Sequence, residues 1–370
     1  MKTRESLADK LATARQLTGM STRAVAEKLG RRGFQVSHAT VANYEKGASV
    51  PPLDLLSILA ELYDRPINWF LQSGRTLTAV RYRNLPSKVR VGDLHHFEAD
   101  VKRWLDAYDA IETRLERPLV AEIGDFQAED GEDPDDLARR LRRRLGMNLD
   151  DPIPSVIEVL HQFGIRVIEQ ETELRIDGLA AVYGTENIVA LNSRIPNDRG
   201  RLTAAHELAH LLYGDFSGRS ASEPKKAEER AFAFASHFIL PNAQLKRAIE
   251  GQSVVRLVQF KERFGISLAA MVYRAESLRI ITKATSKKLW SAFSQKGWKT
   301  SEPGTVRPDR ATRFEQLLDE GIFQERMTMR EAADLAGVRQ EDIRHRLQAA
   351  MGITAAAMEE DGPDLLQFPK

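Results

Sequence analysis

The sequence predicts an α+β protein that is mostly helical and built from more than one domain. Apolar residues recur every three or four positions along most of the chain, which is the spacing of helices that pack on a core. Between residues 165 and 192 the pattern changes to short β-branched runs, which predict strands. A chain of 370 residues is long enough for two or three domains, each with its own core.

The amino-acid composition limits the kinds of function and location expected for the chain. Hydrophobic residues make up 42% of the chain and charged residues 29%, and the formal net charge is only +1, so any contact with nucleic acid must be local. The absence of cysteine excludes disulfides and thiolate metal sites and agrees with an intracellular protein. We find no apolar run of the length of a signal peptide or a membrane-spanning helix, so we expect a cytoplasmic location.

The first 74 residues predict a bundle of short helices. Ser21 and Ser37 are placed to cap the second and third helices, and a further apolar helix runs from Leu53 to Tyr63. A short helix, a turn and a second short helix with a polar face form the layout that places a recognition helix in the DNA major groove.

Two motifs in this bundle are specific. The runs AVAEKLG and SHATVANYEKG follow one another, and they resemble the Cro/C1-type (XRE family) helix-turn-helix domain over residues 6–74. We therefore assign residues 1–74 to a domain that binds a double-stranded DNA operator. By position, the resemblance implies base contacts by His38, Ala39, Thr40 and Asn43 and phosphate contacts by Arg23, Arg31, Ser37 and Lys46.

Charge gives this assignment little support. Ten basic and seven acidic side chains lie between residues 2 and 65, so a helical bundle that contacts proteins is the alternative. We favour DNA because the motifs are more specific than the charge. Paired operator half-sites would favour a homodimer.

The middle of the chain leads from this domain to the predicted strands. We interpret residues 75–118 as a linker followed by one connecting helix. The later run from Arg139 to Arg144 lies on a helix with one apolar stripe, so we interpret it as a solvated face rather than a nucleic-acid site. Three runs then predict a small three-stranded sheet: 165–168, 179–183 and 188–192. An edge strand of this sheet could bind an extended polypeptide.

The most informative run is HELAH at residues 206–210. Its spacing places His206 and His210 on one face of a helix, with Glu207 between them. Buried histidines are more often packed core residues than ligands. Here, however, the surrounding helix is apolar on nearly every side, so two His and a Glu need a reason to be buried there. Two imidazoles, a third protein ligand and a water would complete a zinc site, one per chain, with Glu207 as the base.

The third ligand is expected on the following helix, which ends before Pro241. Glu228 at its start is the first candidate, while Glu229 and His237 are alternatives on the same helix. The charged residues around Glu228 could also be only a solvated first turn.

A longer match around the HELAH run implies which of these residues is the third ligand. The run RGRLTAAHELAHLLYG, followed by an E-x-x-A-x-x-F-A-x-x-F-I-L-P helix, resembles the ImmA/IrrE family of zinc metallopeptidases. The resemblance implies that His206, His210 and Glu228 bind zinc and that Glu207 is the general base, within a zincin-like domain spanning residues 119–282. Phe232 and Leu202 depart from the family pattern, but neither is a ligand or the base.

Other assignments remain open at this point. Tyr183, Tyr213 and His237 are candidates for a second donor to the oxyanion. Residues 288–304 are expected to form a loop or extension, and residues 283–370 a helical C-terminal region.

The leading hypothesis is a DNA-binding zinc endopeptidase and transcription regulator. The family resemblance implies cleavage of a helix-turn-helix repressor in a stress response, and the fused DNA-binding domain adds another copy of this chain as a substrate. One alternative is a transcription regulator whose zinc domain senses or stabilises without proteolysis. A small-peptide hydrolase with an incidental helical domain is the weaker alternative.

Overall fold

The computed structural model describes residues 4–5, 7–65, 67–71, 74–85, 88–215, 224–250 and 253–350. The chain divides into two compact units, which comprise Met1–Lys102 with Leu119–Ala311 and Arg103–Pro118 with Thr312–Lys370. The last part of the predicted C-terminal region, residues 351–370, lies outside the described residues. No helix in the described part of the chain is long and apolar enough to cross a membrane.

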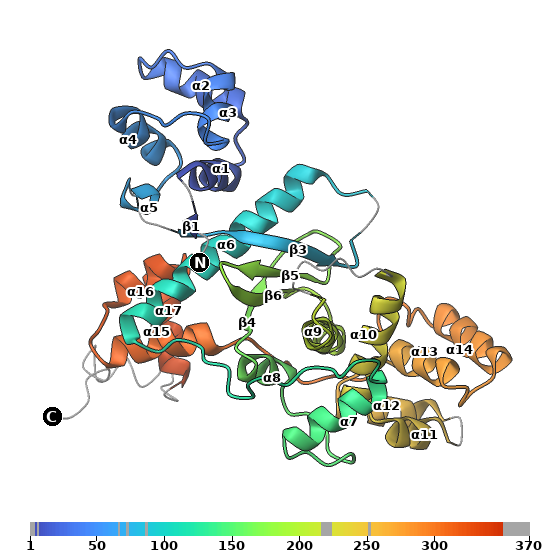
Figure 1. Cartoon of the computed structure of the whole chain (residues 1–370). Coiled ribbons are helices and arrows are strands. Elements are labelled where there is room, and N and C mark those ends of the chain that lie inside the picture. The colour runs from blue at the N-terminus through green and yellow to red at the C-terminus, as the bar shows by residue number, and fades with distance from the viewer. Residues whose placement is uncertain are drawn as a thin grey trace. The chain divides into compact units, whose positions relative to one another are not determined.

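The N-terminal region is helical, as predicted. Its helices are α1 (Leu7–Leu17), α2 (Thr22–Arg31), α3 (His38–Glu45), α4 (Leu53–Leu62) and α5 (Ile67–Leu71) (Figure 1). Both predicted caps are present, because Ser21 Oγ accepts from the Ala24 amide at 3.2 Å and Ser37 Oγ from the Thr40 amide at 3.0 Å. These caps fix where α2 and α3 begin, and the buried faces of α1 to α5 share a core of their own.

Two small sheets follow. The short strands β1 (Arg4–Glu5) and β2 (Gly74–Arg75) pair antiparallel. The larger sheet has four strands in the order β3-β5-β6-β4, with β4 and β6 parallel and the other pairs antiparallel. Its strands are β3 (Leu77–Arg83), β4 (Arg166–Gln170), β5 (Gly178–Tyr183) and β6 (Glu186–Asn192).

Strand β3 is the difference from the three strands that the sequence predicts. It comes from the segment interpreted as a linker and forms one edge of the sheet. Its pairing with β5 shifts register between Thr78 and Arg81, where Ala79 has a φ of 52°. Such a bulge redirects the side chains that follow it, which here include Arg81 and Arg83.

Helices cover this sheet and build the main core. Helices α8 and α9 pack against β4 and β6, and α10 packs against both α9 and α7 (Figure 1). Phe234 and Phe238 of α10 stack in this core with ring centroids 5.5 Å apart. The helices of the first unit in this part of the chain are α7 (Pro134–Arg144), α8 (Val156–Gln162), α9 (Asn197–Leu212), α10 (Pro224–Ile239), α11 (Asn242–Ile249), α12 (Val254–Phe264), α13 (Leu268–Ser277) and α14 (Lys283–Gln295).

Two details of the sequence interpretation are wrong here. Residues 288–295 belong to α14 rather than to a loop, because Thr282 caps a helix that packs Leu289, Trp290 and Phe293 on the core. The arginine run is not solvated throughout either. Arg142 is fully buried and donates to the carbonyl oxygens of Phe238 at 2.7 Å, of Asn148 at 2.6 Å and of Asp151.

The second unit is helical, as predicted for the end of the chain. Helix α6 (Val91–Leu115) contributes its residues from Arg103 onward. Within the unit, the rings of Trp104 and Tyr108 lie 4.9 and 5.4 Å from the Phe314 ring. The other helices are α15 (Arg313–Phe323), α16 (Met329–Ala336) and α17 (Gln340–Ala350).

Candidate metal centre

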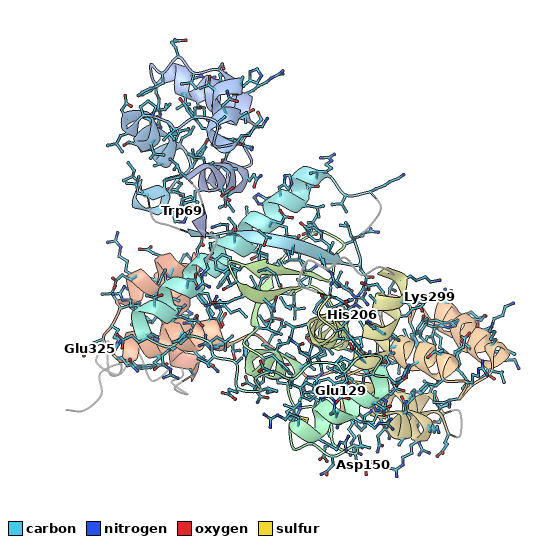
Figure 2. All side chains as sticks on the ribbon, in the orientation of Figure 1. Trp69, Glu129, Asp150, His206, Lys299 and Glu325 are labelled. Atoms are coloured by element: carbon cyan, nitrogen blue, oxygen red, sulfur yellow. The ribbon has the colours of Figure 1, made fainter. Side chains whose placement is uncertain are left out.

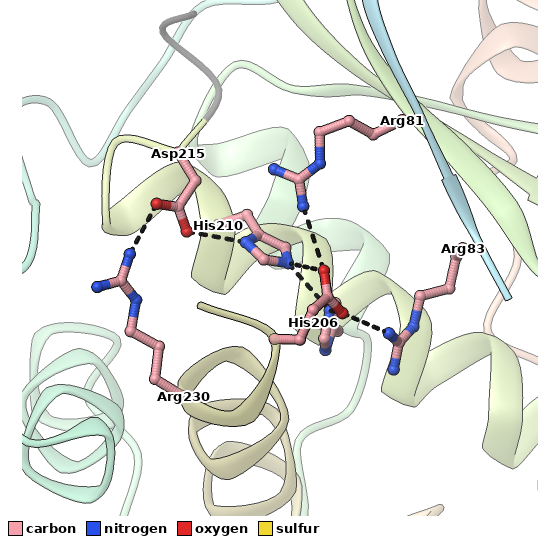
Figure 3. Close-up of polar contacts among 7 residues, drawn as sticks. Arg81, Arg83, His206, His210, Asp215 and Arg230 are labelled. Carbon is pink, nitrogen blue, oxygen red and sulfur yellow. Dashed lines mark hydrogen bonds and ion pairs between the residues drawn. The ribbon is translucent and has the colours of Figure 1, made fainter. Parts of the chain in front are cut away.

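Helix α9 carries the residues of the HELAH run. His206 and His210 are each 1% exposed and Glu207 is 5% exposed, because α9 is enclosed by the sheet and by α8 and α10. The four-residue spacing places both imidazoles on one face, with ring centroids 4.7 Å apart. The two rings are nearly perpendicular, with 73° between their planes, and both lie near the centre of Figure 3.

Glu228, from the first turns of α10, completes a cluster of three ligand atoms. His206 Nε2 lies 3.0 Å from His210 Nε2 and 3.1 Å from Glu228 Oε2, and His210 Nε2 lies 3.3 Å from Glu228 Oε1. Atoms bound about 2.0–2.1 Å from a tetrahedral zinc lie roughly 3.3–3.4 Å apart. The cluster therefore has nearly the spacing that a tetrahedral cation requires. Glu229 and His237 are not in it.

Proton positions also favour a cation. His210 Nδ1 lies 2.9 Å from Asp215 Oδ2, a carboxylate that can only accept, so this nitrogen carries the proton. In a neutral ring the lone pair of His210 Nε2 then points at Glu228 Oε1, another acceptor. A cation between these atoms removes the repulsion. Burial lowers the pKa of His206 to about 4, so this ring is neutral at neutral pH, as a metal ligand must be.

Asp215 orients one of the candidate ligands, His210. Its other oxygen accepts from Arg230 Nη2 at 2.7 Å, so the chain Arg230–Asp215–His210 fixes the orientation of the ring (Figure 3). A carboxylate that orients a ligating histidine in this way also raises its basicity.

Replacing Asp215 should weaken the metal site without removing a candidate ligand. We expect Asp215→Ala to lower zinc affinity about 10- to 100-fold, because His210 loses the acceptor that fixes its tautomer. Competition with a zinc chelator measures the effect, and Glu229→Ala serves as a control for the loss of a nearby carboxylate. Equal affinities of the two variants would contradict the supporting role.

Glu207 lies beside the cluster and outside it. Burial raises the pKa of its carboxyl, and Oε2 has no hydrogen-bond partner. A buried carboxylate with an unused oxygen is a strong proton acceptor, which fits a general base.

The comparisons with known proteins agree with this geometry. Residues 160–276 match the peptidase family model described as an IrrE N-terminal-like domain. This part of the chain is similar to an IrrE-like domain. Residues 11–70 match a helix-turn-helix model, so the chain joins the two domains that its motifs predict. No curated protein matched the chain.

Two of the three proposed oxyanion donors, His237 and Tyr213, contact residues outside the cluster. His237 lies beside Asp135, with 3.5 Å between Nδ1 and Oδ1. The Tyr213 hydroxyl donates to the Glu132 carbonyl at 3.3 Å. Tyr183 is buried in β5.

Sequence reasoning missed two arginines that do reach the cluster. Arg83 Nη1 donates to Glu228 Oε2 at 2.9 Å, and Arg81 Nη2 lies 3.8 Å from Glu228 Oε1 (Figure 3). Both come from β3, outside the matched family region. Their i, i+2 spacing in the run LTAVRYR is that of one strand face, and this was the available signal.

A cleft opens beside the cluster. It has a volume of about 950 Å³, and Glu228 and Arg83 are among its lining residues. Its walls come from α9, α10, α13, α14 and the segment from Trp298 to Val306, which includes Lys299, labelled in Figure 2. A polypeptide therefore has room to approach the candidate centre.

The helix-turn-helix domain presents most of its predicted DNA contacts to solvent. Seven of the eight side chains are exposed: Arg23, Arg31, Ser37, His38, Ala39, Asn43 and Lys46. Thr40 is partly buried, and its hydroxyl lies 2.9 Å from Ser37 Oγ. Ser37 is engaged as the cap of α3, and Arg31 pairs with Glu27 at 2.7 Å. These two have less freedom to reach phosphates.

Proposed function

We propose that the protein is a DNA-binding zinc endopeptidase that regulates transcription. The observation that carries this proposal is the convergence of His206, His210 and Glu228 beside the buried carboxyl of Glu207. The match to an IrrE-like peptidase domain and to a helix-turn-helix domain supports it.

In this proposal the metal and the residues around it have separate roles in hydrolysis. Zinc held by His206, His210 and Glu228 would supply the Lewis acid that activates a water and polarises the peptide carbonyl. Glu207 takes the proton of the attacking water and passes it to the leaving amine. Arg81 and Arg83 lie 3.8 and 2.9 Å from the Glu228 carboxylate. Our proposal gives them, rather than the tyrosines or His237, the role of stabilising the negative charge that develops on the carbonyl oxygen beside it.

The substrate we propose is a protein that shares the operator. The DNA-binding domain brings the peptidase to regulatory DNA, so a helix-turn-helix repressor or another copy of this chain would be within reach. Cleavage of either would change transcription, as a stress response requires.

Metal removal tests the enzymatic part. We expect the purified chain, loaded with zinc, to cleave members of a proteome-derived peptide library, to lose this activity after chelation, and to regain it with added zinc. Cleavage that persists after complete removal of the metal would contradict the proposal, as would its absence from the zinc-loaded protein.

The DNA-binding part predicts a specific loss. Asn43 is exposed on α3 at a position expected to read bases, so Asn43→Ala should weaken binding to the operator by about 1–3 kcal/mol. Gel shifts on DNA from upstream of the protein's own gene measure this, with Gln295→Ala as an exposed control on α14. A wild-type protein that shifts this DNA no better than unrelated DNA would count against the regulator.

A further inference from the structure

Four aromatic residues line the cleft beside Glu228. Phe232 follows Glu228 by one helical turn on α10, and its ring packs edge-on against Tyr273, with centroids 4.9 Å apart. Tyr273 is 55% exposed, so its ring is accessible to a bound molecule. We call this surface the aromatic wall and define it by four residues that line the cleft: Phe232, Tyr273, Trp290 and Trp298.

The charged residues of the cleft are largely engaged within the chain. Lys261 Nζ lies 2.9 Å from Asp198 Oδ2 and 3.0 Å from Glu302 Oε2. Arg199 pairs with Asp177 at 2.8 Å. Because these charged side chains are already paired with each other, they do not require a complementary charge on the substrate. The rings are therefore the features best suited to select a side chain.

The same cleft adjoins a strand edge. Arg83 at the end of β3 and the next residue, Asn84, both line it, and β3 is an edge of the four-stranded sheet. An extended peptide that pairs with an edge strand displays alternate side chains to pockets on one side. A peptide in this position would pass Glu228 and reach Phe232 on the next turn of α10.

We propose that the aromatic wall is a specificity subsite that takes a large apolar side chain, aromatic or long aliphatic, close to the bond that is cleaved. This rests on the proposed function, because it names the substrate class of the same site. The occupant is a segment of polypeptide whose large side chain packs against these rings. Burial of that side chain supplies the selectivity.

Binding tests the subsite without requiring turnover. Zinc-loaded Glu207→Gln protein is mixed with fluorescent peptides that differ only in one central residue, Phe or Ala, and Kd is measured by anisotropy. The Phe peptide should bind about tenfold more tightly or better, as burial of one large side chain provides. Adding Tyr273→Ala or Phe232→Asn should remove most of this preference. Phe323→Ala, which changes a partly exposed phenylalanine of the second unit, should preserve it.

The outcomes separate the two proposals. Equal affinity for the Phe and Ala peptides, including no measurable binding of either, would overturn the subsite. So would a preference that survives both wall substitutions in proteins that retain their zinc. A preference that the wall substitutions remove, in a protein whose wild type cleaves nothing, would refute the peptidase and leave the aromatic wall as a binding site for a large apolar side chain only.

Discussion

Glu207→Gln should retain zinc and lose peptide-bond hydrolysis almost completely. The amide is close in shape to the carboxylate and lies outside the ligand cluster, so metal binding is preserved. It cannot accept the proton of the attacking water, and loss of general-base catalysis typically costs about 10²–10⁴-fold in rate. Metal analysis together with the rate of peptide cleavage measures both effects.

Ligand variants provide the contrast. His206→Ala and Glu228→Ala should lose the metal, because each removes one of three converging ligand atoms. Glu229→Ala is the matched control, since it removes the adjacent exposed carboxylate of the same helix. Unchanged zinc content in His206→Ala would refute the ligand assignment, and cleavage by Glu207→Gln at the wild-type rate would refute the base.

Arg142→Met should destabilise the first unit by about 3–5 kcal/mol. Arg142 is fully buried, and burial lowers the pKa of its guanidinium. Its donors hold the Phe238 carbonyl of α10 and the Asn148 and Asp151 carbonyls of the following loop. Removing them leaves the buried Phe238 carbonyl and the part-buried Asn148 and Asp151 carbonyls without this donor. A fully buried acceptor that loses its partner costs about 1–3 kcal/mol, and the apolar replacement offsets part of the loss.

Arg143, the next residue of the same helix, provides a matched control with the same substitution. Arg143 is exposed, so Arg143→Met should change stability by less than about 0.5 kcal/mol. Urea unfolding followed by circular dichroism compares the midpoints. Equal midpoints for the two variants would show that the buried contacts of Arg142 contribute nothing.

The features that could be predicted from the sequence are formed by residues that lie close together in the chain. The caps at Ser21 and Ser37 and the shared helical face of His206 and His210 depend on residues only three or four positions apart. Helical spacing of Leu289, Trp290 and Phe293 also contained the signal for α14, although the polar residues around them favoured a loop.

What the sequence could not predict depends on distant partners. Strand β3 is stabilised by β5, about 100 residues later, so its short pattern resembled a linker. Arg142 is one arginine in a run, and only the position of α10 shows that its side chain is enclosed. Arg83 reaches Glu228 for the same reason: the fold brings together two segments separated by 145 residues.

The central claim, that this DNA-binding protein is a protease, is tested most directly by comparing new protein N-termini in cells that carry the wild type or Glu207→Gln. The comparison is made with and without DNA damage or oxidative stress. The proposal predicts fragments that occur only with the wild type and that derive from a helix-turn-helix repressor or from this chain itself. Identical profiles under every condition, with zinc bound to both proteins, would contradict proteolysis and favour a regulator that the zinc domain only stabilises.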